Sequence, residues 1–224
     1  MAGRAEFLDN IRHRTQTGRY KPTHAPDVAW TPGEAPRESA YIDDPPARFL
    51  EELDALGGHG ARVGTMEEAR DYVLDLARSR GAKLLVRWDV GELEELGVDG
   101  PLAEEGVEVV PWRDLEDFRT VTARADVGLS TAEWAIAETG SLVLTSGPGK
   151  GRTVTLLPPT YVAVLPAERV LRTVPEAVDK YARADGALPA NVVFHTGPSR
   201  SGDIQMEIFV GMHGPGDVHV ILVG

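Results

Sequence analysis

One carboxylate in this chain lies between two apolar stretches and beside a glycine. Apolar residues alternate along positions 134–144, on both sides of Glu138-Thr139-Gly140. Alternation with a period of two is typical of half-buried strands, and glycine supplies the positive φ of a tight turn. We therefore expect an antiparallel hairpin that holds Glu138 at a strand end as a nucleophile or general base, with Thr139 and Gly140 contacting a substrate. The alternative is an ordinary solvated glutamate.

Two loops near the C-terminal end carry a second group of polar residues. One loop holds Ser199, Arg200 and Asp203, and the other holds His213 and Gly214. Arginine presents a planar fork of donors to a carboxylate or phosphate, and histidine exchanges a proton near neutral pH. Loops at the strand ends of an α/β sheet commonly hold ligands, so we expect an anion-binding site in which His213 carries a proton. The alternative is a surface turn with a stray arginine.

A glycine-rich loop, Gly147–Arg152, follows the expected hairpin. It is not a Walker loop, because Leu144 occupies the place of the first glycine and Gly151 that of the Ser or Thr. Its backbone amides, with Lys150 and Arg152, are nevertheless suited to hold a carboxylate or phosphate. The competing interpretation is a flexible connection from the hairpin to a strand.

The histidines do not form a metal-binding pattern. His195, His213 and His219 occur late in the chain with Asp203 and Glu207 between them, and no pair has a recognised ligand spacing. His219 lies within an apolar strand-like run, where a half-buried, hydrogen-bonded histidine is the commoner case. We therefore expect no metal site.

Strand-like and helix-like segments alternate from residue 46 onward. Thr65 and Glu68 have the spacing of a capping box, which predicts a helix from there to Gly81. Such alternation predicts an α/β fold with a mostly parallel central sheet flanked by helices, together with the antiparallel hairpin near Glu138. Further strands are expected near 84–86, 107–110, 161–165, 191–194, 207–210 and 218–223, and further helices near 49–56, 92–96, 114–124 and 175–184.

The first 45 residues have a different character. A weakly amphipathic segment, Glu6–Thr15, predicts a short helix, and prolines at 22, 26, 32 and 36 interrupt any regular structure after it. We expect residues 1–45 to form an N-terminal helix and proline-rich arm, and residues 46–224 to form the folded domain.

Composition excludes several classes of function. The formal net charge of −12 over 224 residues argues against a nucleic-acid partner, which would require clustered Lys and Arg. The sequence has no apolar run of the roughly 20 residues that cross a bilayer and no signal-peptide pattern, so we expect a cytoplasmic protein. Because it has no cysteine, the chain cannot hold a thiolate-bound iron–sulfur cluster.

Four motifs occur in a distinctive order. They are Ala137–Leu144, Leu157-Pro158-Pro159, Gly197-Pro198-Ser199-Arg200 with Asp203-Ile204, and Gly211 with His213-Gly214-Pro215. In this order and spacing the chain resembles the lactate utilisation protein C family, which is built on the LUD domain. The resemblance covers roughly residues 46–224.

The resemblance implies a fold similar to ribose-5-phosphate isomerase, glucosamine-phosphate deaminase and the coenzyme A transferases. It also implies a subunit that acts with iron–sulfur partners in oxidising L-lactate, or a similar 2-hydroxy acid, to pyruvate. The clusters would then belong to the partners, and this chain would bind a small carboxylate or phosphate. Two alternatives stay open: a stand-alone acyl or coenzyme A transferase or sugar-phosphate isomerase-like enzyme that uses Glu138, and a non-catalytic anion-binding regulatory protein.

Overall fold

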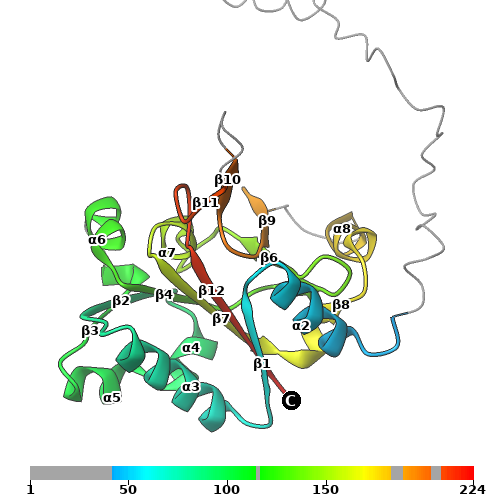
Figure 1. The fold of residues 1–224 in the computed structure, drawn as a ribbon. Coiled ribbons are helices and arrows are strands. Elements are labelled where there is room, and N and C mark those ends of the chain that lie inside the picture. The colour runs from blue at the N-terminus through cyan, green and yellow to red at the C-terminus, as the bar shows by residue number, and fades with distance from the viewer. Residues whose placement is uncertain (1–41, 115–116, 183–188, 203–207) are drawn as a thin grey trace, which may run out of the picture. The chain divides into compact units, whose positions relative to one another are not determined.

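A computed structural model describes residues 42–114, 117–182, 189–202 and 208–224 (Figure 1). In this part of the chain, the central sheet has six strands in the order β1-β12-β7-β4-β2-β3, and every neighbouring pair is parallel. The expected α/β fold with a mostly parallel sheet is therefore confirmed. The strands are β1 (His59–Val63), β2 (Leu84–Arg87), β3 (Glu108–Pro111), β4 (Val127–Ser130), β7 (Thr160–Pro166) and β12 (Asp217–Val223).

Helices cover both faces of this sheet. Figure 1 shows α3, α4 and α5 on one side and α6 and α7 on the other, as right-handed crossovers between parallel strands require. Strand β4 is buried along its whole length, and only the ends of β7 and β12 are partly exposed. Their sequences are apolar because both faces of the sheet are covered. The helices are α3 (Met66–Ser79), α4 (Gly91–Leu96), α5 (Asp99–Glu104), α6 (Phe118–Arg124) and α7 (Arg152–Leu156).

A second sheet has the strand order β8-β5-β6-β9. The expected hairpin is confirmed, since β5 and β6 pair antiparallel with Ala135 opposite Leu142. Strand β5 ends at Ile136, however, so Glu138 lies within the connecting turn and not at a strand end. The sheet consists of β5 (Trp134–Ile136), β6 (Ser141–Thr145), β8 (Val170–Leu171) and β9 (Val192–Thr196), and helices α2 (Pro45–Ala55) and α8 (Val174–Ala182) pack beside β5 and β8.

Most expected elements are present within a residue or two of their expected bounds. Four elements in the sheet and its crossovers were not expected, namely β1, β4, α5 and α7. Strand β4 reads Val-Gly-Leu-Ser, and its Gly128 leaves room for α7, because a Cβ there would lie 2.0 Å from the carbonyl oxygen of Val154. Two further short strands, β10 (Arg200–Gly202) and β11 (Ile208–Val210), pair with each other. The expected helix over Glu6–Thr15 and nearly all of the proline-rich arm lie outside the described residues.

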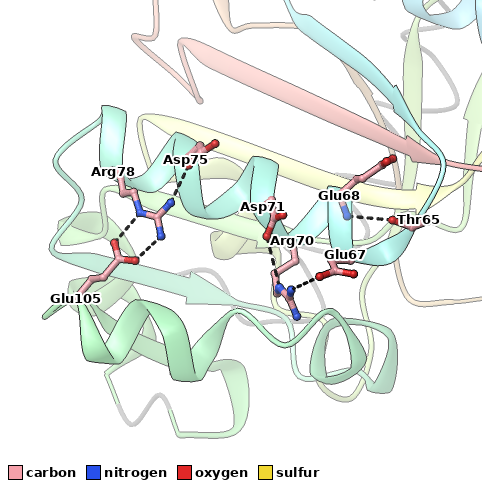
Figure 2. Close-up of polar contacts among 8 residues, drawn as sticks. All are labelled: Thr65, Glu67, Glu68, Arg70, Asp71, Asp75, Arg78 and Glu105. Atoms are coloured by element: carbon pink, nitrogen blue, oxygen red, sulfur yellow. Dashed lines mark hydrogen bonds and ion pairs between the residues drawn. The ribbon is translucent and has the colours of Figure 1, made fainter.

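The start of α3 largely follows the expected capping box (Figure 2). The Thr65 hydroxyl accepts a hydrogen bond from the Glu68 N–H at 3.1 Å. The Glu68 carboxylate accepts a hydrogen bond from the Gly64 N–H at 2.7 Å, whereas in a standard capping box it would accept from the Thr65 N–H. At the other end of α3, Arg78 forms two hydrogen bonds with Glu105 at the end of α5, which joins the two crossover helices. Exposed ion pairs of this kind contribute little to the free energy of unfolding, so the burial of its apolar face provides most of the stability of α3.

Gly140 fixes the close approach of α2 to the hairpin turn. It has φ +60°, and a Cβ there would lie 2.8 Å from the backbone nitrogen of Leu53 and 2.9 Å from the carbonyl carbon of Glu52. A side chain would therefore be strained by its own backbone and would push the helix away.

We expect Gly140→Ala to lower the free energy of unfolding by about 1–3 kcal/mol, because the added methyl group meets backbone that cannot move aside. Gly100→Ala is the matched control, since Gly100 lies in α5 with ordinary φ and no atom within 4 Å of the new Cβ. Chemical denaturation checks both variants. Equal stability of the two would show that α2 does not depend on Gly140.

Candidate functional site

The strand order points to the side of the central sheet where the parallel strands have their carboxyl ends. We call this side the carboxyl edge, and the side where the strands begin the amino edge. The chain passes from β2 outward to β3, and then returns across β2 to β4, so its direction reverses between β2 and β4. In open α/β sheets, ligands bind in the crevice outside the carboxyl ends of the strands at such a reversal. Trp88 and Asp89 directly follow β2, Trp112 follows β3 and Thr131 follows β4.

The glycine-rich loop Gly147–Arg152 lies over this edge. The Asp89 N–H donates to the Gly149 carbonyl at 2.9 Å, and the Trp88 indole N–H donates to the Gly151 carbonyl at 2.9 Å. Gly149 has φ +75° and leaves no space for a side chain against the Asp89 carbonyl. The residues that follow β2 thus hold the loop in place. The loop leads into helix α7, so the competing interpretation, a connection from the hairpin to a strand, is wrong.

A hollow of about 300 Å³ opens beside this loop. Trp112 and Phe118 form its aromatic part, with ring centroids 5.6 Å apart. The Thr153 hydroxyl oxygen is buried and has no hydrogen-bond partner among the described residues. The volume is at the lower end of the range for small-molecule sites. The lining residues are Trp112, Phe118, Ser146, Gly147, Lys150, Gly151, Arg152 and Thr153.

The two cations of the loop have different surroundings. The Lys150 ammonium forms an ion pair with the half-buried Glu133, which also accepts a hydrogen bond from the Thr145 hydroxyl at 2.9 Å. Although burial by itself raises it, these bonds hold the pKa of Glu133 below its usual value, so Glu133 balances the Lys150 charge. Arg152 is exposed, and its guanidinium pairs with no side chain in the described ranges. Among the described residues that line the hollow, Arg152 is therefore the cation whose charge no side chain compensates.

The other expected anion-binding residues lie at the amino edge, where the strands of the central sheet begin. Ser199 and Gly214 are neighbours, because the Ser199 N–H donates to the Pro215 carbonyl at 2.8 Å. This loop is fixed near the start of β7, where Pro159 accepts a hydrogen bond from Gly216. His213 belongs to the same loop and is exposed. The structure thus brings Ser199, His213 and Gly214 together at the amino ends of the strands and separates them from Lys150 and Arg152.

Arg200 has a structural contact at this edge. Its guanidinium donates to the carbonyl oxygen of Leu56, which follows the last turn of α2. A cation there satisfies an open carbonyl and interacts favourably with the helix dipole. Asp203, expected to act beside Arg200, lies outside the described residues.

The carboxylate of Glu138 is bonded to backbone. Its Oε1 accepts a hydrogen bond from the N–H of Val174, the first residue of α8, at 2.6 Å. The neighbouring Thr139 hydroxyl donates to Ser141, whose hydroxyl in turn bonds to that of Thr196. Glu138 thereby satisfies a free donor at the start of a helix, and Thr139 and Gly140 join the hairpin turn to β9 and α2.

His195 is an ionisable group that is mostly, but not fully, buried. It lies on β9 with its ring centroid 5.0 Å from that of Tyr161 on β7, and its Nδ1 has no hydrogen-bond partner among the described residues. Burial lowers the pKa of His195 to about 4, because the imidazolium would lose its hydration there. The histidine is therefore neutral at physiological pH and packs between the two sheets.

Sequence reasoning missed the aromatic wall of the hollow. Trp112 falls between the expected strand over 107–110 and the expected helix over 114–124, Phe118 falls within that helix, and neither was considered for binding. A usable signal was present, because Trp88 and Trp112 each directly follow a strand of the parallel sheet. Thr153 carried no signal, since α7 itself was not expected.

Comparison with known proteins identifies the family. The LUD domain family model matches residues 46–223. The chain belongs to the LUD-domain family. A relative from Shouchella clausii, named lactate utilization protein C, is 31% identical over 219 residues, which cover 95% of this chain and 93% of the relative. A relative of the same name from Halalkalibacterium halodurans is 35% identical over 159 residues, covering 69% of this chain and 67% of that protein.

A solved structure shares the LUD-domain architecture. The crystal structure of a DUF162 family protein from Deinococcus radiodurans aligns with a TM-score of 0.56, covering 80% of this chain and 95% of that chain at 20% sequence identity. This likeness bears on the fold alone. In the described part of this LUD-domain protein, no helix has the length and apolar character needed to span a membrane.

Glu138 of this LUD-domain protein offers a direct test of structural against chemical roles. We expect Glu138→Ala to lower the free energy of unfolding by about 1 kcal/mol, because the Val174 N–H loses its acceptor. Glu138→Gln keeps an acceptor oxygen and should be closer to the parent in both stability and function. Thermal unfolding measures the stability of the two variants, and complementation of a host strain that lacks the gene measures their function. A stable Glu138→Gln variant that has lost function would instead mark the carboxylate as catalytic.

His195 predicts a pH dependence of stability for this LUD-domain protein. Its pKa is about 4 when folded and about 6.5 when unfolded, so the unfolded chain binds more protons between these values. The neutral imidazole of His195 contributes fully to the free energy of unfolding above pH 6.5. This contribution is lost as the pH falls from 6.5 toward 4, and the free energy of unfolding falls by up to about 3 kcal/mol. We expect His195→Gln to flatten this decline in urea unfolding measured from pH 7 to 4. If the free energy of unfolding falls equally with pH in the parent and in His195→Gln, the burial of a neutral histidine at this position is contradicted.

Proposed function

We propose that this LUD-domain protein acts in lactate utilisation, as a subunit that works with iron–sulfur partners in oxidising L-lactate, or a similar 2-hydroxy acid, to pyruvate. The observation that carries the proposal is the near full-length match to a protein named lactate utilization protein C. In this proposal the iron–sulfur clusters belong to the partners, because a chain without cysteine has no thiolate to hold one.

Within this function, the hollow beside Gly147–Arg152 binds a small carboxylate or phosphate. The Arg152 guanidinium has no ion-pair partner among the residues that the structure describes, so it is available to hold a carboxylate through two parallel hydrogen bonds. Lys150 contributes less, because Glu133 already neutralises it. Trp112 and Phe118 exclude water from one side of the ligand and so strengthen the ion pair.

The surroundings of the other candidate groups favour a binding subunit over a stand-alone Glu138 enzyme. The Glu138 carboxylate is bonded to the start of α8 and is not among the residues that line the hollow. His213 belongs to the loop at the amino ends of β7 and β12 and is not among the residues that line the hollow beside Arg152. His213 remains a proposed proton carrier only for chemistry at its own edge.

Growth on lactate tests the function. We expect deletion of the gene from its natural host to prevent growth on L-lactate as sole carbon source, with normal growth on glucose. The parent gene should restore growth, and Arg152→Gln should restore it poorly because the anion loses its bidentate partner. Arg124→Gln is the matched control, since Arg124 is an exposed arginine at the end of α6 that does not line the hollow.

The outcomes separate the function from the site. Normal growth of the deletion strain on lactate would overturn the role in lactate utilisation. Full complementation by Arg152→Gln would leave that role intact and reject the hollow as its binding site. Anaerobic affinity purification from lactate-grown cells tests the partners, and recovery of the chain without cysteine-rich, iron-containing proteins would reject the subunit model.

A further inference from the structure

Two histidines and an aspartate meet where β1 and β12 begin. His59, the first residue of β1, pairs in register with His219 on β12, and Asp217 lies two residues before His219 and so on the same face of the sheet. One ligand atom from each residue lies within 4.8 Å of the other two. Within the described ranges of the chain, no other three His, Cys, Asp or Glu residues are grouped this closely.

The spacing of these atoms fits a small cation. Asp217 Oδ1 lies 2.9 Å from His219 Nε2 and 3.6 Å from His59 Nε2. In a tetrahedral zinc site with bonds of about 2.0–2.1 Å, the ligand atoms are about 3.3 Å apart. Both Asp217 distances lie within about half an ångström of this value, and all three ligand atoms lie within 4.8 Å of one another, so a small adjustment of the exposed His59 side chain would admit the ion.

A supporting shell holds the aspartate in position. Its second oxygen, Oδ2, accepts a hydrogen bond from the Arg80 guanidinium at 2.8 Å and from the Thr160 hydroxyl at 3.2 Å. These contacts leave Oδ1 directed at the two imidazoles. The Arg80 charge lowers the affinity for a cation, but it occupies the oxygen that the cation does not need.

A second contact orients the buried histidine. His219 Nδ1 shares a hydrogen bond of 2.9 Å with the Tyr72 hydroxyl. A hydroxyl both donates and accepts, so Tyr72 supports either neutral tautomer of His219. When Nε2 donates to Asp217, Nδ1 accepts from Tyr72, and when Nε2 binds an ion, Nδ1 carries the proton and donates to Tyr72. This is the outer-shell arrangement by which proteins fix metal-binding histidines.

We propose that His59, Asp217 and His219 bind a divalent first-row transition ion, for which Zn²⁺ is the test ion. Two imidazole nitrogens and one carboxylate oxygen suit such an ion, whereas Mg²⁺ and Ca²⁺ require sites built from oxygen. The side chain of His59 is 56% exposed, which gives the ion a path from solvent. With three protein ligands, a fourth position faces water and is open to an external ligand.

The test is zinc binding to the full chain after treatment with a chelator, measured by equilibrium dialysis and calorimetry, with Co²⁺ absorption reporting the coordination. We expect one Zn²⁺ per chain and no competition by Mg²⁺. His59→Gln and Asp217→Asn should weaken binding at least tenfold, and Tyr72→Phe by about tenfold, since outer-shell losses cost about 10–100-fold. His213→Gln is the matched control, because it removes an exposed histidine outside the cluster.

Two results would overturn the proposal. One is the absence of stoichiometric Zn²⁺ binding by the folded parent, which would mark the cluster as a hydrogen-bonded anchor between β1 and β12. The other is binding by His59→Gln that equals that of the parent. Because His59 is exposed, this variant should keep the fold, which circular dichroism verifies. The measurement needs no catalytic activity and is independent of the role in lactate utilisation.

Discussion

Burial of the central sheet on both faces is the constraint on which the rest of this structure depends. Strands β4, β7 and β12 have helices or the second sheet on either side, so they must be apolar and nearly continuous. Parallel strands then need crossovers, and all their carboxyl ends fall at one edge. The reversal of strand order between β2 and β4 creates the crevice there, over which the loop Gly147–Arg152 lies.

Several motif residues that suggest chemistry serve to assemble the layers. Gly140 and Gly197 both have positive φ and leave room for α2, because Leu53 of α2 lies against Gly140 and Leu56, which follows the helix, lies against Gly197. Arg200 closes the end of the same helix, and Glu138 satisfies the first amide of α8. Backbone groups at helix ends need hydrogen-bond partners, and at these junctions Arg200 and Glu138 supply them.

The two groups of residues left for ligands lie at opposite edges of the sheet. At the carboxyl edge, Glu133 neutralises Lys150, which leaves Arg152 as the cation for the proposed anion. At the amino edge, Asp217 faces His59 and His219 and offers donors for a cation. In a protein with net charge −12, the proposed anion site therefore depends on a local charge, the Arg152 guanidinium beside aromatic side chains, and not on the overall field.

The sequence by itself determined the fold class, the hairpin around Glu138-Thr139-Gly140, the capped start of α3 and the family, because these depend on local periodicity, turn chemistry and motif order. It also contained Lys150 and Arg152 as anion-binding candidates. Only the tertiary structure decided that Glu138 bonds to Val174, that Trp112 joins Arg152 at one hollow, and that His59 meets His219. Residues 160 positions apart become neighbours through strand pairing, and local patterns carry no information about which strands pair.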